Sequence, residues 1–240
     1  MKLDDIKKLQ QKKYRAEFGH FLVEGEHLLL ELQKAAVRDP QLQRSELYVT
    51  AAYEHWQSPF RTHLISDRQM AQIADTRTPQ GIVAVVPMPE SAMVGVEGER
   101  AIYLHEIQDP GNLGTILRTL AWFGGFRCLL SPGSVDPYNP KVVRSSMGAI
   151  FHTPLELDVP LDALRSRFER IACLDMSGDS LQAASFRTFD CYLFGNEARG
   201  VPREQLTALN AHPFTIPGCG AIESLNLAAT VNMCAYELSR

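Results

Sequence analysis

Three short polar segments carry the residue types best suited to chemistry in this chain. They are QDPGNLG at 108–114, GNEARG at 195–200 and GCGAIESLN at 218–226. Each follows an apolar run and precedes a helical pattern, so each can present backbone N–H groups and a helix N-terminus to a ligand. Taken singly each signal is weak, because Gly, Asn and Ser also serve ordinary turns and caps.

Arg118 lies just beyond the first of these segments, on a predicted amphipathic helix. The apolar stripe of that helix recurs at i, i+3, i+4, i+7 and i+8, and consists of Leu113, Ile116, Leu117, Leu120 and Ala121. Arg118 is about 140° around the helix from Leu113, outside the stripe and one turn before Trp122. On spacing alone a surface salt bridge is the commoner role, and a guanidinium aimed at a ligand is the alternative.

The elements that must position these segments alternate between strand-like and helical patterns. Apolar strand-like runs occupy 101–107, 126–132, 170–176, 191–195 and 213–217. Helical patterns occupy 112–124, 140–149, 161–169, 203–210 and 224–238. This alternation predicts an α/β fold with a mostly parallel sheet covered on both faces. Ligands of such sheets bind beyond the carboxyl ends of the strands, where the three polar segments fall.

A second, smaller α/β domain is predicted upstream. A strand and a helix are expected within 21–33, strands at 46–50 and 81–86, and a helix at 67–74. Proline and glycine become frequent over 85–100, which favours a domain boundary there. We therefore predict domains at 1–90 and 99–240, joined by a linker at 91–98.

Charge is distributed unevenly along the chain. The net charge of −4 argues against wholesale electrostatic binding to nucleic acid. Residues 1–15, however, hold six basic side chains against two acidic ones. This basic leader is compatible with an arm that contacts phosphates, and equally with a solvated helix face.

Several classes of protein are disfavoured. The N-terminus is too charged for a signal peptide and no apolar run is long enough for a membrane helix, so we expect a cytoplasmic protein. The five cysteines form no CxxC pair and the seven histidines have no ligand spacing, so we expect reduced core thiols and no metal. Neither G-x-G-x-x-G nor G-x-x-x-x-G-K-[ST] occurs, which makes a doubly wound oxidoreductase a poor alternative.

Together, the three segments resemble the motifs of the SpoU/TrmH family of RNA ribose methyltransferases. They match N-x-G-x-x-x-R at 112–118, G-N-E-x-x-G at 195–200 and I-P…E-S-L-N…Y-E at 216–237, in the family's order. Residues 141–155 resemble the segment between the first two motifs. Residues 6–32 and 75–86 are similar to the ends of the small RNA-binding domain that often precedes the catalytic domain, whereas 38–66 match least.

The resemblance implies a parallel α/β catalytic domain with a deep C-terminal trefoil knot that holds S-adenosylmethionine. Pattern reasoning alone would exclude a knot. It also implies a homodimer, with the last helix and the first motif near the interface. The residues that it assigns to the cofactor are Leu174, Gly195, Asn196, Ile216, Pro217, Ser224, Leu225 and Asn226.

The residues that the resemblance assigns to catalysis are Asn112, Arg118, Glu197, Ser224 and Asn226. Arg118 would handle the ribose hydroxyl as a base, or would hold a substrate phosphate that accepts the proton. A guanidinium pKa above about 12 makes the second role as suitable as the first. Ordinary structural roles stay open: Ser224 as a helix cap, Asn196 in a turn, and Glu197 in an ion pair with Arg199 or Arg203.

The predicted substrate is structured RNA, with large-subunit ribosomal RNA favoured. Transfer RNA, or a catalytically silent RNA-binding protein of the same fold, is the alternative. The basic residues assigned to RNA are Lys8, Lys12, Lys13, Arg15, Arg118 and Arg144. Tyr14 and Phe18 could meet an RNA loop, whereas Phe21, inside a strand-like run, is expected in the core.

Overall fold

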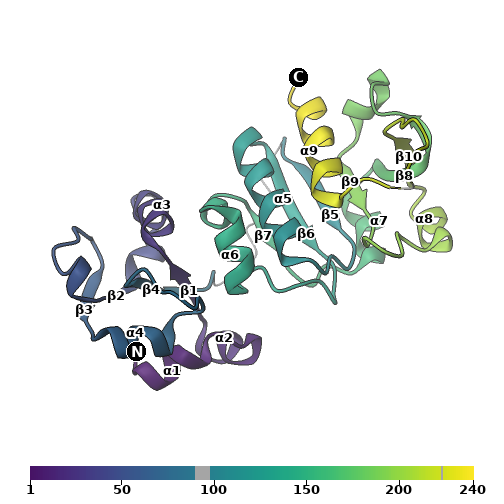
Figure 1. The fold of residues 1–240 in the computed structure, drawn as a ribbon. Coiled ribbons are helices and arrows are strands. Elements are labelled where there is room, and N and C mark those ends of the chain that lie inside the picture. The colour runs from purple at the N-terminus through teal and green to yellow at the C-terminus, as the bar shows by residue number, and fades with distance from the viewer. Residues whose placement is uncertain (90–97, 223) are drawn as a thin grey trace. The chain divides into compact units, whose positions relative to one another are not determined.

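The computed structural model describes residues 1–89, 98–222 and 224–240 (Figure 1). Contacts divide the chain into two compact units. The first unit is Met1–Ser91 with Asp136–His152, and the second is Ala92–Val135 with Thr153–Arg240. The predicted linker lies outside the described residues except for Gly98. The domain boundaries at 90 and 99 stay a prediction, and nothing in the sequence indicated that 136–152 packs with the first unit.

The first unit is built on a four-stranded sheet in the order β1-β4-β2-β3. Its strands are β1 (His20–Glu24), β2 (Glu46–Val49), β3 (Arg61–Leu64) and β4 (Ile82–Pro87). Strand β4 is antiparallel to both β1 and β2, and β3 is parallel to β2. The strands expected within 21–33, 46–50 and 81–86 are confirmed, whereas β3 lies in the region that no pattern predicted.

Among the described residues, five α-helices belong to the first unit. They are α1 (Leu3–Lys8), α2 (Lys12–Phe18), α3 (Glu26–Ala36), α4 (Asp67–Ile73) and α6 (Pro140–Ser146). The predicted helix at 67–74 is confirmed as α4, which begins with a capping box between Ser66 and Gln69. Ile6 and Leu9 from the basic leader pack into the core beside Leu22. The leader is therefore an integral part of the folded unit.

Aromatic contacts and a buried ion pair hold the segment 136–152 in the first unit. Phe21 is buried, as predicted, and its ring lies 4.9 Å from that of Tyr138. The Arg15 side chain is only 3% exposed and donates from Nε to an Asp136 carboxylate oxygen at 2.9 Å. A buried charge is stable only with such a partner.

The second unit is built on six parallel strands in the order β10-β8-β9-β5-β6-β7. They are β5 (Arg100–Leu104), β6 (Phe126–Leu130), β7 (Leu155–Glu156), β8 (Ile171–Ser180), β9 (Cys191–Phe194) and β10 (His212–Thr215). The prediction of a parallel α/β sheet is confirmed. From Ala101 to Leu104 the strand β5 is fully buried, as expected where both faces of a sheet are covered.

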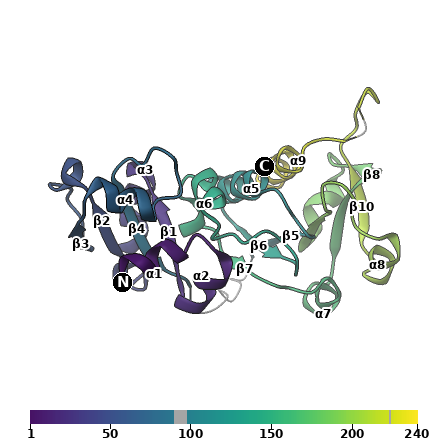
Figure 2. The same cartoon turned by 60° about the horizontal axis from the view of Figure 1, so that its bottom comes forward.

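In the described part of the second unit, four α-helices accompany this sheet: α5 (Pro110–Phe123), α7 (Leu164–Arg167), α8 (Arg203–Ala208) and α9 (Leu227–Leu238). Helices α5 and α9 lie side by side although they are far apart in the sequence (Figures 1 and 2). Four residues of the predicted α5 stripe are buried, namely Leu113, Ile116, Leu117 and Leu120, whereas the fifth, Ala121, is half-buried. Short 3₁₀ segments complete the described residues at 42–44, 51–53, 149–151, 161–163 and 184–188.

Candidate active site

The start of helix α5 is fixed by local sequence. Pro110 occupies its first turn, where the missing N–H costs nothing and the restricted φ suits a helix. The preceding Asp109 caps the helix, its carboxylate accepting a hydrogen bond from the Asn112 N–H at 2.7 Å. Asn112 is thereby held in the first turn, just beyond the carboxyl end of β5.

The side chain of Asn112 links the three polar segments. Its Nδ2 donates to Glu197 Oε1 at 3.3 Å, and its Oδ1 accepts from Asn226 Nδ2 at 2.9 Å. Glu197 and Asn226 are 85 and 114 residues away from it in the sequence. Asn226 also caps helix α9 through its Oδ1, which accepts from the Ala229 N–H. One residue from each motif therefore meets the others at this edge of the sheet.

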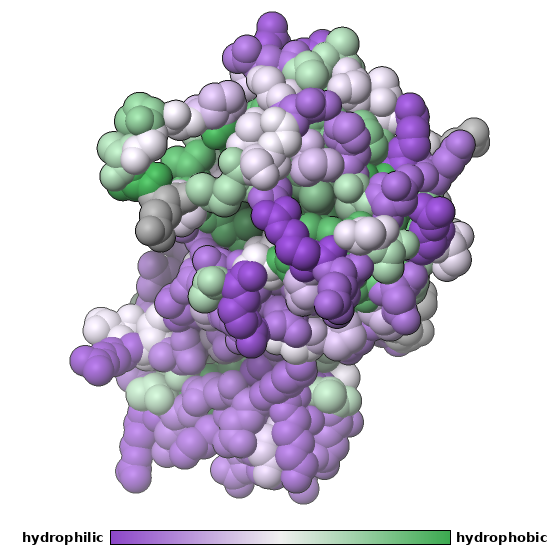
Figure 3. Space-filling model, turned by 90° about the vertical axis from the view of Figure 1, so that its right-hand side faces the viewer, coloured by the Kyte–Doolittle hydropathy of each residue, from purple (hydrophilic) through white to green (hydrophobic). Residues whose placement is uncertain are grey.

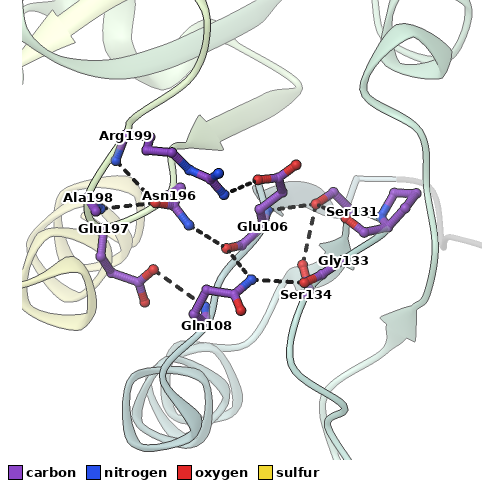
Figure 4. A network of polar contacts seen from close by, with 10 residues as sticks. Glu106, Gln108, Ser131, Gly133, Ser134, Asn196, Glu197, Ala198 and Arg199 are labelled. Atoms are coloured by element: carbon purple, nitrogen blue, oxygen red, sulfur yellow. Dashed lines mark hydrogen bonds and ion pairs between the residues drawn. The ribbon is translucent and has the colours of Figure 1, made fainter.

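A tight turn presents Glu197. The backbones of Asn196 and Gly200 exchange two hydrogen bonds, and the Asn196 Oδ1 accepts from the N–H groups of Ala198 and Arg199. Asn196 is 7% exposed and donates from Nδ2 to the Glu106 carbonyl oxygen at 2.8 Å. The structural role expected as an alternative for Asn196 is thus confirmed. Figure 4 shows this turn facing the 106–108 and 131–134 segments.

Glu197 forms no ion pair with either neighbouring arginine. Its carboxylate accepts from Asn112 and, at 3.4 Å, from the backbone N–H of Gln108. Arg199 pairs instead with Glu106 at 2.6 Å, and Arg203 pairs with Asp175 at 2.7 Å. The alternative in which Glu197 serves an ion pair with Arg199 or Arg203 is therefore wrong.

Arg118 projects from α5 into solvent. It is exposed, and no other residue in the described part of the chain gives it a hydrogen bond or an ion pair. Among the described residues, Arg118 therefore does not form the surface salt bridge that its spacing on the helix favoured. Trp122, one turn further along α5, is 84% exposed. An arginine on a rigid helix with no internal partner is available to an external anion.

In the third polar segment, the described residues between Gly218 and Leu225 make no hydrogen bond from backbone to backbone. Ser224 is exposed and does not cap α9, since Asn226 does so. Large apolar side chains are exposed here and on β8: Met176, Ile222 and Leu225. Figure 3 likewise shows apolar side chains open among hydrophilic ones on one face of the molecule.

Other predicted cofactor residues lie on the strands that lead into these loops. Leu174 is half-buried on β8, and Ile216 and Pro217 follow β10. Gly195 follows β9, and a Cβ added there would lie 2.7 Å from the Gly200 Cα. Only a glycine therefore permits this close approach of the backbone.

The model of the SpoU rRNA Methylase family matches residues 99–236. The chain belongs to this family. An MRM3-like substrate binding domain matches residues 2–84. The predicted family and the parallel α/β fold of its catalytic domain are thus confirmed, and the three linked segments are those of a SpoU-family methylase.

Relatives of this SpoU-family chain extend over nearly its whole length. The 23S rRNA (guanosine(2553)-2'-O)-methyltransferase RlmP of Bacillus subtilis is 31% identical, over 99% of this chain and 95% of that protein. The structure of a putative RNA methyltransferase of the TrmH family from Porphyromonas gingivalis is 29% identical, with a TM-score of 0.83, over 98% of this chain and 96% of that one. An AdoMet-bound rRNA methyltransferase from Sinorhizobium meliloti, 24% identical over 98% and 93%, shares the fold with a TM-score of 0.81.

Of the basic residues predicted to bind RNA in the first unit, some are exposed and others pair with an acidic side chain. Lys12 and Lys13 are exposed on α2, and Lys8, half-buried on α1, pairs with Asp5 at 2.9 Å. Arg15 is a correction: its side chain is buried against Asp136 and Leu9, so it serves packing and not RNA. Arg144 pairs with Asp75 at the surface of the first unit.

Sequence analysis gave no role to Glu106, and it placed Gln108 in the first polar segment without assigning it a function. Glu106 adopts a left-handed φ of +49°, and its carbonyl oxygen accepts from both Asn196 and Gln108 Nε2. Gln108 also donates to the Gly133 carbonyl oxygen at 2.8 Å. The signal was their place directly after a buried strand, but neither residue belongs to the motif pattern.

The cysteine thiols differ in their exposure. Burial raises the pKa of the Cys128 thiol to about 12 and that of Cys173 to about 11, which keeps both protonated. Cys219 is exposed and corrects the expectation of core thiols at that position. No described group of His, Cys, Asp and Glu residues could hold a metal ion, and no described helix is long and apolar enough to cross a membrane.

Proposed function

We propose that this chain transfers the methyl group of S-adenosylmethionine to the 2'-hydroxyl of a guanosine ribose in large-subunit ribosomal RNA, in the cytoplasm. The observation that carries the proposal is the junction of Asn112, Glu197 and Asn226 at the carboxyl edge of the sheet. Arg118, on the same helix as Asn112, is exposed and has no ion pair among the described residues. RlmP, by its name, modifies guanosine 2553 of 23S rRNA at the 2'-O position, and 95% of its length is covered.

The loops after β9 and β10 have the donor set that suits this cofactor. Open backbone groups between Gly218 and Leu225 can bind its polar atoms, while exposed Ile222 and Leu225 can pack against its apolar surface. Gly195, Asn196, Ile216, Pro217 and Leu174 would form the remaining walls. When bound, the cofactor supplies a methyl group on a sulfonium, so that the donor carbon is already activated.

The task of the protein is then alignment and removal of one proton. Asn112, fixed by hydrogen bonds on both sides, provides a rigid polar wall next to Glu197. The exposed fork of Arg118 is suited to hold a phosphate of the ribose-phosphate backbone in two-point contact. That phosphate, or a group near it, accepts the hydroxyl proton, because a guanidinium stays protonated and is a poor base.

The first unit is proposed to bind the RNA. Its match to a substrate binding domain supports this role, as do the lysines Lys8, Lys12 and Lys13 along α1 and α2. Arg144 would join them by exchanging Asp75 for a phosphate, since its pair is partly exposed. The contribution of such lysines is electrostatic and should fall with salt.

A homodimer and a C-terminal trefoil knot are further parts of the proposal. Large apolar side chains are exposed on the neighbouring helices α5 and α9, namely Trp122, Met233 and Tyr236. An exposed apolar surface of this kind favours a protein interface. A dimer through these helices would bring Arg118 to the interface, and the loop between β10 and α9 would form the knot.

The test is transfer of labelled methyl from S-adenosylmethionine to unmodified 23S rRNA and, separately, to transfer RNA, with mapping of 2'-O-methyl nucleotides. We expect label on one guanosine of 23S rRNA. Label on transfer RNA alone would contradict the proposed substrate. Cofactor binding without label on either RNA would contradict both substrate assignments, and absence of cofactor binding would contradict the enzyme itself.

A further inference from the structure

Two arginines, Arg199 and Arg203, are close to Glu197 in the sequence. Arg199 is two residues away on the same tight turn, and Arg203 follows at the start of α8. An ionised carboxylate binds a guanidinium more strongly than a neutral amide. In isolation the turn would therefore pair Glu197 with Arg199 and release Asn112.

The observed contacts are arranged differently. Figure 4 shows the Arg199 guanidinium turned toward Glu106, while the Glu197 side chain extends the other way, toward Gln108. Arg203 is likewise occupied by both carboxylate oxygens of Asp175, at 2.7 and 3.1 Å. Each arginine near Glu197 thus has an acidic partner elsewhere in the sheet domain, Asp175 on β8 for Arg203 and Glu106 in the loop after β5 for Arg199, and the Glu197 carboxylate stays with Asn112.

Backbone hydrogen bonds fix Glu106 in a position from which its carboxylate binds Arg199. Its N–H donates to Ser131 Oγ at 2.6 Å, and its carbonyl oxygen accepts from Asn196 and Gln108. Its φ of +49° is unfavourable for a residue other than glycine and persists only because these neighbours fix it. A glycine would suit the backbone better, so what the glutamate adds at this position is its carboxylate.

We propose that Glu106 is a positioning residue that binds Arg199 and so keeps the Glu197 carboxylate free to hold Asn112. This inference rests on the proposed function. It predicts a specific pattern of suppression: loss of Glu106 should be harmful only while Arg199 is present to pair with Glu197.

The experiment compares methyl transfer to 23S rRNA by the wild type, E106Q, R199Q and the double variant E106Q/R199Q. We expect E106Q to lower kcat by about three- to tenfold, in line with the strength of an exposed ion pair. R199Q should stay within about twofold of the wild type, and the double variant should recover to within about twofold. The mispaired Arg199–Glu197 contact is exposed, so added salt should lessen the E106Q defect.

Two controls separate this effect from folding. E106G keeps the backbone carbonyl and removes the strain at positive φ, so it should show the same defect and the same rescue by R199Q. R167Q removes an exposed two-point pair with Glu156 on β7 and should leave kcat unchanged.

The inference is overturned if E106Q is fully active, or if E106Q/R199Q is no better than E106Q. A defect in R199Q equal to that of E106Q would also overturn it, because the ion pair itself would then be needed. An inactive wild type would refute the proposed function instead, so the two failures are distinguishable.

Discussion

The buried ion pair between Arg15 and Asp136 offers a quantitative test of how the first unit is held together. The two side chains are 3% and 10% exposed. Arg15 donates to Asp136 from two nitrogens and to the Leu9 carbonyl oxygen at 2.8 Å. Asp136 also accepts from the backbone N–H of Tyr138. The pair therefore connects α2 with the segment that precedes α6.

Asp136→Asn keeps the shape and the Tyr138 contact but leaves a guanidinium buried without a counter-charge. Removing one partner of a buried pair costs about 3–5 kcal/mol, because desolvation of the remaining charge is no longer compensated. Arg15→Met with Asp136→Asn removes that charge as well, and should cost less than the sum of the single changes. Arg144→Gln is the matched control, because its pair with Asp75 is 36% and 33% exposed and contributes at most about 1 kcal/mol.

The assay is urea denaturation combined with hydrogen exchange of the peptides from α2 and from 136–152. Hydrogen exchange reports the free energy of opening of the first unit separately from that of the second. A loss below about 1 kcal/mol in Asp136→Asn, equal to that in Arg144→Gln, would refute the assignment of this pair to the packed interior.

Three further predictions follow from single positions. Gly195→Ala should weaken S-adenosylmethionine binding more than about tenfold by calorimetry, because its Cβ would lie 2.7 Å from the Gly200 backbone; unchanged affinity would contradict the role of this turn. Ellman's reagent should modify one thiol, Cys219, in the native protein and five in denaturant, and a second fast thiol would contradict the burial of the others. The hydrogen bond from Arg187 holds the pKa of Glu237 below its ordinary 4.5, so the stability it adds is present above that pH and lost as the pH falls below it. Glu237→Gln should therefore flatten the fall in Tm between about pH 5 and about pH 3, whereas an unchanged slope would show that other carboxyl groups cause it.

The fold was predictable where hydrophobic periodicity is strong. The fully buried strand β5 and the stripe of α5 gave continuous and 3.6-residue patterns, and both appear where they were expected. Strand β3 could not be found, because three of its four residues are exposed and it carries no apolar run. Pattern analysis depends on burial, and an exposed edge strand supplies little of it.

The candidate site was predictable for a different reason. Asn112, Glu197 and Asn226 were found through motif resemblance, whereas their direct hydrogen bonds emerged only from the fold, since 85 and 114 residues separate them. Arg15 was misassigned because a basic residue in a basic leader gives no sign of a partner at position 136. Glu106 was missed because its role depends on a left-handed backbone conformation and on an ion pair with Arg199, and the residues around position 106 indicate neither.

In the proposed function, Arg118 handles the ribose-phosphate at the reacting centre. Its most direct test is Arg118→Lys, with single-turnover methyl transfer to 23S rRNA and calorimetric binding of S-adenosylmethionine measured on the same preparation. We expect cofactor affinity within about twofold of the wild type and a rate lowered by about a hundredfold or more, because a lysine keeps the charge but lacks the planar fork. Near-normal turnover by the lysine variant would show that Arg118 does not have this role.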